Sequence, residues 1–226
     1  MIKIHDQLTQ GTDEWLAARC GMLTASNVKK LFTKTHALSK GETGKTLAHE
    51  LLAQRITQYV EPQYWSDDML RGCNDEIIAR NIYSLKYNKA HEVGFITREF
   101  TNAGVTFTLG YSPDGLVGDP GCIEVKSRCQ KFQVRTILDG VCPGEYMLQV
   151  QTGMLVANRK WCDFVSFCGG MPMFVCRVLP DAELQQKILT AATDFERTLQ
   201  ANQAIYAANI TGLTMTERTV EEELFV

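Results

Sequence analysis

Hydrophobic and polar positions alternate in two short stretches near the middle of the chain. Across Val105–Tyr111, every second residue is aliphatic or aromatic, and the residues between them are threonine or glycine. Across Gly121–Ser127, Ile123 and Val125 fall on one face, while an acid and a base fall on the other. Because side chains two residues apart on a strand point to the same face, both stretches are predicted to be strands.

Longer stretches follow the period of a helix. The pattern predicts helices over residues 12–20, 24–32, 46–59, 67–87, 145–158 and 181–208, and further strands over residues 91–100, 161–168 and 173–179. The 67–87 helix carries an apolar stripe typical of a surface that faces a core: Met69, Leu70, Cys73, Ile77, Ile78, Ile82 and Leu85. This order of elements favours an α/β fold in which helices flank a mixed sheet.

Composition agrees with one globular domain over residues 1–226, since 45% of the residues are hydrophobic and 22% are charged. No apolar run indicates a signal peptide or a membrane span. The net charge of −3 gives no overall attraction for nucleic acid. A nucleic-acid enzyme with this charge must therefore concentrate its cations locally.

The eight cysteines are scattered and include no Cys-x-x-Cys pair. This spacing argues against a zinc ribbon, and an iron–sulfur cluster would also need tighter clustering. We expect most of the cysteines to be reduced and buried as small hydrophobic residues. At the end of the chain, the acids of TERTVEEELFV are expected to be solvated, while Leu224 and Phe225 could dock on a neighbouring subunit.

A Pro-Asp-Gly turn and a Glu-x-Lys strand lie close together in the sequence. Nine residues separate Asp114 from Glu124, which stands two residues before Lys126. The short glycine-rich loop between them predicts that the two central strands pair as a hairpin, which brings Asp114 beside Glu124. Neighbouring carboxylates repel unless a cation lies between them, and Mg²⁺ binds one or two carboxylates with phosphate oxygens and water. Each pattern alone is ordinary structural chemistry, but together they indicate the metal site of a nuclease.

Positive residues gather in two further places. Arg128, Lys131 and Arg135 stand at helical spacing directly after the metal strand, where they would share one helix face. A solvated helix face is one interpretation, and their position favours contact with DNA phosphates. Residues 33–44 form a polar loop, expected to be mobile, whose basic residues could guide a nucleic acid strand.

Several polar residues allow both a structural and a functional interpretation. Arg19 and Ser26 fit a surface charge and a helix cap, or a phosphate pocket near a helix N-terminus. Glu76 fits an ordinary solvated acid beside the apolar stripe. Gln149 lies in a mostly apolar helix and needs a hydrogen-bond partner, which favours a position facing a cleft.

Four motifs together resemble the lambda-exonuclease (YqaJ-type) family of phage recombination nucleases. They are DEWLAARCGMLTASNV near the N-terminus, RGCNDE in the 67–87 helix, YSPDGL followed by IEVK, and YMLQVQTGM in the next helix. They occur in the family's order and cover about residues 12–160, whereas the hairpin, helix and tail of residues 161–226 are less distinctive. The resemblance implies a restriction-endonuclease-like, PD-(D/E)xK fold.

The resemblance also implies an activity. Enzymes of this family are 5′→3′ exonucleases that act processively on linear double-stranded DNA, release mononucleotides from 5′-phosphorylated ends and leave a 3′ single strand for annealing. They use two Mg²⁺ ions per site, which Mn²⁺ can replace, and two such ions stabilise the entering and leaving oxygens of a phosphodiester. The implied assembly is a homotrimeric ring, with a single-strand annealing protein as partner, in the cytoplasm of a bacterial host.

Site roles follow by resemblance, residue by residue. The implied metal ligands are Asp114, Glu124, Glu76 and the carbonyl of Val125. Lys126 is the implied catalytic lysine, as a base or as a stabiliser of charge, and Gln149 helps to hold the site. The implied 5′-phosphate site contains Arg19, Ser26 and Ser112. The residues expected to contact DNA are Arg128, Lys131, Arg135, Tyr146 and Met69, the last as an apolar wedge between strands.

Two other functions remain open. One is a RecB-like or endonucleolytic enzyme of the same fold, although RecB-like domains often place a tyrosine four residues after the motif glutamine, where this chain has Gly153. The other is a non-catalytic protein that binds DNA ends as a recombination scaffold. The presence of all five catalytic side chains disfavours that alternative.

Overall fold

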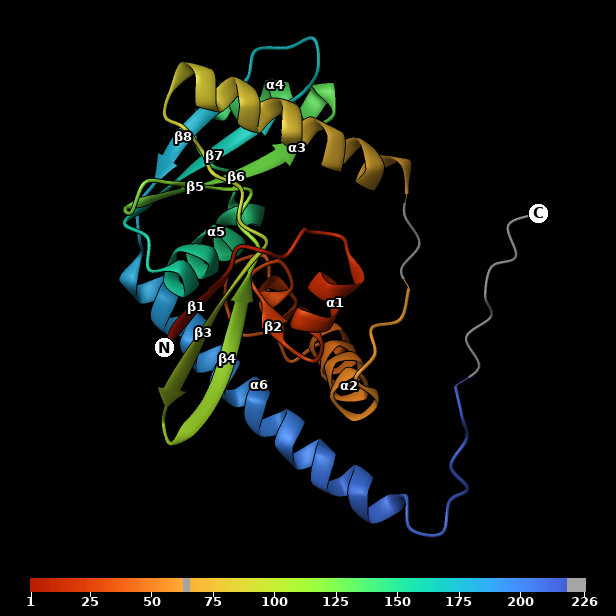
Figure 1. The fold of residues 1–226 in the computed structure, drawn as a ribbon. Coiled ribbons are helices and arrows are strands. Elements are labelled where there is room, and N and C mark those ends of the chain that lie inside the picture. The colour runs from red at the N-terminus through yellow and green to blue at the C-terminus, as the bar shows by residue number, and fades with distance from the viewer. Residues whose placement is uncertain (63–65, 219–226) are drawn as a thin grey trace, which may run out of the picture.

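Two four-stranded sheets form the frame of the computed structural model, which describes residues 1–62 and 66–218 (Figure 1). The first sheet has the order β1-β3-β4-β2, with β1 Ile2–His5, β2 Leu23–Thr24, β3 Phe95–Asn102 and β4 Val105–Tyr111. The second has the order β5-β6-β7-β8, with β5 Gly115–Val117, β6 Gly121–Ser127, β7 Trp161–Phe167 and β8 Phe174–Val178. Both sheets mix parallel and antiparallel pairs, so the predicted mixed α/β class is confirmed, but the strands divide between two sheets.

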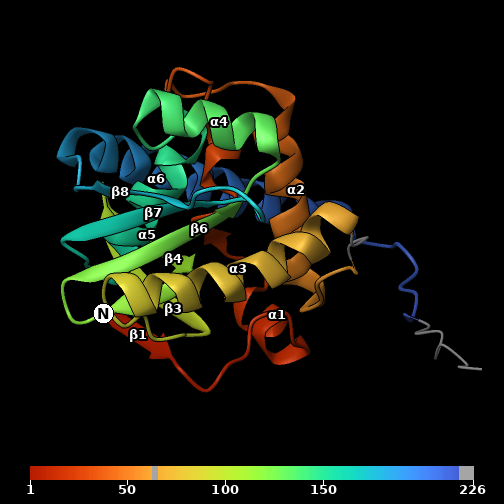
Figure 2. The same ribbon diagram turned by 90° about the horizontal axis from the view of Figure 1, so that it is seen from above.

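Helices cover the faces of both sheets. The elements are α1 Asp13–Arg19, the 3₁₀ helix η1 Val28–Leu31, α2 Glu42–Thr57, α3 Asp67–Lys86, α4 Gln130–Asp139, α5 Gly144–Ala157 and α6 Ala182–Asn209. Helix α5 lies between the sheets and packs against β3, β4 and β7 (Figure 1). Helix α6 runs along the first sheet beside α2, and α3 covers the outer face of β6 and β7 (Figures 1 and 2).

The predicted hairpin between the two central strands is wrong. Strand β4 pairs with β3 and β2, and β6 pairs with β5 and β7. The turn that contains Asp114 carries the chain from one sheet to the other, and the three-residue strand β5 then forms the hairpin with β6. Asp114 therefore lies at the junction of the two sheets, beside β6 as predicted but by a different connection.

Two predictions near the N-terminus are also corrected. The predicted 24–32 helix is the short strand β2 followed by the single-turn η1, because Leu23 and Thr24 pair in parallel with β4. The side chain of Asn27 accepts a hydrogen bond from the Thr24 N–H, 2.8 Å away, and fixes this turn. The polar lead contains β1, an edge strand antiparallel to β3.

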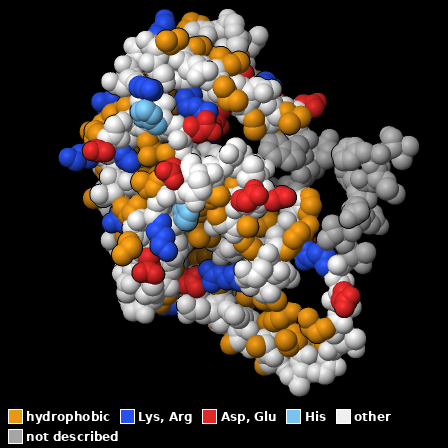
Figure 3. Space-filling model, viewed as in Figure 1, with side chains coloured by type: hydrophobic (Ala, Val, Ile, Leu, Met, Phe, Trp, Pro, Cys, Tyr) orange, Lys and Arg blue, Asp and Glu red, His pale blue; other side chains and the backbone are white. Residues whose placement is uncertain are grey.

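The apolar stripe of α3 does not face the core. Met69, Leu70, Ile77, Ile78 and Leu85 are between 43% and 88% exposed, and Figure 3 shows hydrophobic side chains along this helix. The buried face of α3 consists instead of Ala79, Arg80 and Tyr83. Ile82 of the predicted stripe packs partly against the same cluster as Ala79 and Tyr83, whereas the five exposed apolar residues remain on the surface.

The cysteines, the helices and the tail were also subjects of prediction. All eight cysteines are free, as expected; four are buried, but Cys73 and Cys129 are exposed. No helix within residues 1–62 and 66–218 is long and apolar enough to cross a membrane. The tail residues Leu224 and Phe225 lie outside the described residues.

Candidate active site

Strand β6 directs its two kinds of side chain to opposite faces, as its alternation predicts. Ile123 and Val125 pack against Ala79 and Tyr83 of α3 in a small apolar cluster. The opposite face turns Glu124 toward α5, where the side chain is almost fully buried. Because the acid is buried rather than set in an open cleft, its oxygens need polar partners from the protein.

Glu124 has three such partners. Lys126 Nζ lies 2.6 Å from Glu124 Oε1, and Gln149 Nε2, from α5, donates to the same oxygen across 2.5 Å. The Tyr111 hydroxyl, from the end of β4, donates to Oε2 across 3.2 Å. The predicted residues Lys126 and Gln149 thus meet at one carboxylate, joined by a tyrosine whose role the sequence did not indicate.

Asp114 is held against the same strand. Its Oδ2 accepts a hydrogen bond of 2.6 Å from the Val125 N–H, and the residue is 8% exposed. The adjoining β5–β6 hairpin pairs Gly115 with Ile123, which fixes the register between the turn and the strand. The two motif carboxylates are therefore brought together beside the middle of β6.

Glu76 joins this group from α3 through Arg80. Arg80 Nη1 donates to Glu76 Oε1 across 3.0 Å and to the Asp114 backbone carbonyl across 2.8 Å. Its Nη2 donates to Glu92 Oε2 across 2.7 Å. One buried guanidinium thus connects the helix acid, the Asp114 turn and the segment before β3.

The nearby cations do not offset the burial and mutual repulsion of the carboxylates of Asp114 and Glu76. Burial raises the pKa of Asp114 well above its ordinary value, and the charges of Glu124 and Glu76 raise it further. Burial also raises the pKa of Glu76, against the effect of Arg80. Burial alone would lower the pKa of Lys126, but Glu124 and Asp114 outweigh it and raise the value. The arrangement favours the addition of a cation beside these acids.

The donor set fits a hard divalent ion. Within the described chain, no three His, Cys, Asp or Glu side chains are gathered closely enough to ligate a metal by themselves. Mg²⁺ does not need such a cluster, because it retains waters and takes one or two carboxylates with phosphate oxygens. Asp114, Glu124 and the Val125 carbonyl match that need, and Glu76 is the additional acid.

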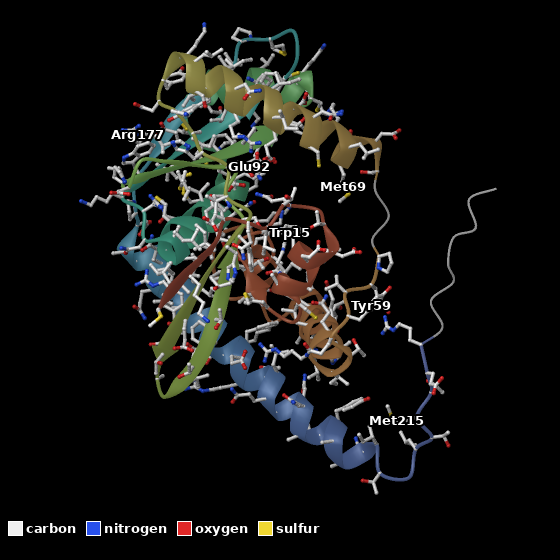
Figure 4. The ribbon with its side chains drawn as sticks, viewed as in Figure 1. Trp15, Tyr59, Met69, Glu92, Arg177 and Met215 are labelled. Carbon is white, nitrogen blue, oxygen red and sulfur yellow. The ribbon has the colours of Figure 1, made fainter. Side chains whose placement is uncertain are left out.

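The predicted phosphate-binding residues converge around Trp15. Trp15, labelled in Figure 4, donates from Nε1 to Ser112 Oγ across 3.0 Å. The Arg19 guanidinium stacks over the indole at 3.9 Å from its centroid. Arg19 Nη2 reaches Ser26 Oγ at 3.5 Å. Burial lowers the pKa of Arg19 to about 10, which leaves it cationic at neutral pH.

The predicted basic helix face is wrong in its geometry. Arg128 precedes α4 and is buried, with Nη1 donating to Glu145 Oε1 across 2.8 Å and to the Tyr146 hydroxyl. Lys131 and Arg135 are exposed on α4, and Arg135 lies 3.5 Å from Asp139. Two separate environments replace the expected continuous stripe, because the strand β6 passes into α4 through a bend.

Three residues of the site were not assigned to it from the sequence. Trp15 belongs to the first motif, but nothing in the sequence links it to Ser112, which lies 97 positions later. Tyr111 was predicted only as an aromatic residue of a strand, and Arg80 was given no role. The available signal was i, i+4 spacing between Glu76 and Arg80, which predicts a helix ion pair but not the bond to Asp114.

Comparison with known proteins supports the motifs. Residues 14–160 match the YqaJ-like viral recombinase domain. The crystal structure of an alkaline exonuclease (LHK-Exo) from Laribacter hongkongensis is 35% identical, with a TM-score of 0.77 over 90% of this chain and 100% of that chain; its complex with dAMP matches equally well. A phage-related exonuclease from Haemophilus somnus 129PT is 14% identical, with a TM-score of 0.52 over 80% of this chain and 96% of that chain, a likeness of fold alone. No curated protein matches significantly.

The family match covers more than half of the chain and includes each motif strand and helix described above. The likeness to the alkaline exonuclease extends beyond that region, into the part of the chain where the sequence is less distinctive. The fold is restriction-endonuclease-like, with mixed sheets flanked by helices. The chain belongs to the YqaJ-like viral recombinase family, of the lambda-exonuclease type.

Proposed function

We propose that this nuclease of phage-type recombination is a Mg²⁺-dependent, processive 5′→3′ exonuclease on linear double-stranded DNA. It would release mononucleotides from 5′-phosphorylated ends and leave a 3′ single strand for annealing. The observation that carries the proposal is the convergence of Asp114, Glu124 and Lys126. Beside it lies the Arg19–Ser26–Ser112 group, of which Ser112 stands on the turn that leads to Asp114.

Hydrolysis requires an in-line attack by water on a phosphodiester, with charge building on the phosphate oxygens. Lys126 would donate hydrogen bonds to those oxygens. Its raised pKa keeps the ammonium charged while it lies against Glu124. Gln149 and Tyr111 fix the two oxygens of Glu124. Two Mg²⁺ ions held by Asp114, Glu124, Glu76 and the Val125 carbonyl would neutralise the acids and stabilise the developing charge.

End recognition is assigned to the group around Trp15. A terminal phosphate carries more charge than an internal phosphodiester, so a cationic guanidinium with nearby hydroxyls favours the phosphorylated end. Ser112 stands two residues before Asp114, which ties recognition of the end to the position of the carboxylate. This short connection would set the distance between the terminal phosphate and the bond that is cut.

Assembly and location extend the proposal. A homotrimeric ring would explain how a chain of net charge −3 retains DNA, since enclosure replaces overall attraction. The 3′ strand would pass to a single-strand annealing protein, and the enzyme would act in the cytoplasm of the bacterial host. Mn²⁺ would support activity in place of Mg²⁺, because both prefer oxygen ligands.

The experiment that tests the proposal is digestion of a linear duplex labelled at either end. With Mg²⁺, we expect label at the 5′ end of each strand to appear as mononucleotide before label at the 3′ end. EDTA should stop the release, and a covalently closed circle should remain intact. Cleavage of the circle would establish an endonuclease instead, and an absence of any cleavage with binding retained would establish a scaffold.

A further inference from the structure

A pocket of about 590 Å³ lies beside the active site and is not used by the function proposed above. Its walls are the segment from Lys29 to His36 and, facing it, α4 with the first turn of α5. Figure 2 shows the loop between η1 and α2 beside α4. This volume is in the range of small-molecule sites.

The pocket concentrates positive charge in an acidic chain. Four cations line it, Lys29, Lys34, Arg128 and Arg135, together with His36. Its two acids are already engaged, since Glu145 bonds Arg128 at 2.8 Å and Asp139 lies 3.5 Å from Arg135. The local excess of cations matches an anionic ligand with more than one charge.

Arg128 has guanidinium N–H groups that form no hydrogen bond to a side chain of the described residues. The residue is 92% buried, and its bonds to side chains in the described chain all come from Nη1. Its Nε is buried and has no hydrogen-bond partner among the residues that the structure describes. Because an unsatisfied buried donor is unfavourable, an acceptor that enters the pocket and bonds this guanidinium is favoured.

Aromatic surface accompanies the charges. Phe132 is 42% exposed and lines the pocket with Phe32 and Leu148. Arg128 and Lys131 each place their charge within about 5 Å of the Phe132 ring, at 5.2 and 5.0 Å. Cations beside an exposed aromatic ring are the lining used for single-stranded nucleic acid, in which bases stack and phosphates pair.

The pocket adjoins the catalytic lysine through one shared ring. Lys126 Nζ lies 5.6 Å from the centroid of Tyr146, and the Arg128 guanidinium carbon lies 5.1 Å from it. Arg128, which lines the pocket, and Lys126 therefore lie within about 6 Å of the same ring. We propose that the pocket binds a nucleotide of an unpaired strand, with its base against Phe132 and its phosphate at Arg128 and Arg135.

The inference rests on the proposed function, because it takes the strand to be part of the DNA being processed. The test is binding of a fluorescent oligothymidylate to the full chain in EDTA, followed by anisotropy, so that no cleavage is needed. We expect Phe132→Ala to weaken binding at least about fivefold, the factor for loss of one stacked base. Arg135→Ala should reduce the slope of log K against log salt by about 0.7, the value for one phosphate contact on a single strand.

A matched control is Arg197→Ala. Arg197 is also an exposed helix arginine paired with a nearby acid, Asp194 at 2.9 Å, but it lies on α6 and not in the pocket. This variant should keep both the wild-type affinity and the wild-type salt slope. Equal losses in Arg197→Ala and Arg135→Ala would show general charge attraction and overturn the proposal.

Two further arms identify the ligand. Thymidine monophosphate should compete with the oligonucleotide far less well than unlabelled strand; equal competition would overturn a strand site in favour of a free mononucleotide. A blunt duplex should show no loss of affinity in Phe132→Ala, and an equal loss would overturn recognition of unpaired bases. Failure of the nuclease proposal would appear separately, in the end-labelled digestion with Mg²⁺, while this binding persisted.

Discussion

Lys126 shows how one side chain links the local pattern to the chemistry. The alternation of β6 places it on the face of Glu124, and their contact of 2.6 Å follows from that period. The acids around it raise its pKa, so it acts as a fixed positive charge in the form of the site described here. A base role would require added cations to lower that pKa.

Replacing this charge gives the first prediction. Lys126→Ala should reduce cleavage by about a hundredfold to a thousandfold or more, as removal of an oxyanion donor does, while DNA binding remains measurable. Single-turnover cleavage and anisotropy on the same duplex measure the two effects. Near-normal turnover would remove Lys126 from the catalytic group.

Arg19 carries the prediction for end recognition. Its guanidinium is oriented by the Trp15 ring and reaches Ser26, so Arg19→Ala should lower the ratio of rates on 5′-phosphoryl and 5′-hydroxyl ends about tenfold. Arg197→Ala is the control, because it changes an exposed arginine far from this group. An unchanged ratio in Arg19→Ala would exclude it from the phosphate site.

At the residue scale, much of the candidate site could be foreseen. Asp114, Glu124 and Lys126 lie within 13 residues of one another, so a turn and a strand period suffice to bring them together. Arg80 could not be foreseen, because its bond to the Asp114 carbonyl spans 34 residues. Nothing local distinguishes that contact from an ordinary helix ion pair.

At the scale of elements, helix α5 packs closely against strand β4. Gly153 of α5 lies so close to the Tyr111 ring that an added Cβ would stand 2.7 Å from it. The missing side chain thus makes room for the tyrosine that donates to Glu124.

Two helical glycines make a matched pair for a test. Gly153→Ala should destabilise the fold by about 1–3 kcal/mol through overpacking and slow cleavage by displacing Tyr111. Gly72→Ala, in α3 with open space around its Cβ, should stabilise by about 0.5–1 kcal/mol. Urea denaturation measures both, and a stabilising Gly153→Ala would contradict the close approach.

Met69 of α3 is the residue predicted to act as an apolar wedge between the DNA strands. Met69 is 43% exposed at the end of the helix nearest α1, the helix that carries Trp15 (Figure 4). Met69→Ala should shorten the length of duplex degraded per binding event and leave activity on single strands unchanged. Leu85→Ala, at the other end of the same exposed stripe, is the control. Equal shortening by both variants would argue against a local wedge.

The type of each element was easier to predict than the strands or helices against which it packs. The long helices and the β7–β8 hairpin follow from period and turn residues. The predicted pairing of β4 with β6 was wrong. The pattern cannot show that β5, only three residues long, pairs with β6 in place of β4. The prediction that the apolar stripe of α3 faces the core was wrong for a related reason. Apolar residues on a helix indicate that the helix contacts something, but they do not show which surface it contacts.

At the scale of the whole molecule, two features agree with the proposed ring. The described chain leaves the large apolar residues of α3 on its surface, and its overall charge does not attract DNA. A contiguous exposed apolar surface commonly marks an interaction site. A ring that encloses the duplex would use such surfaces either between subunits or on the DNA side.

The assembly itself gives a direct prediction. Light scattering after size exclusion should give three times the 25.4 kDa mass of one chain. The trimer should also degrade a long duplex without exchanging onto a competitor added after the start. A mass of one chain at the concentrations used for digestion would exclude enclosure, and processivity would then need another cause.

The guanidinium of Arg80 has a consequence for how such enzymes can diverge. It fastens the middle of α3 to the turn of Asp114, while the N-terminal part of the same rigid helix carries Met69. A change of tilt that adapts this helix to a new kind of DNA end would also move the turn that contains Asp114. In the proposed exonuclease, strand separation by Met69 and cleavage at Asp114 would therefore be mechanically linked, and variants selected for one should show changes in the other.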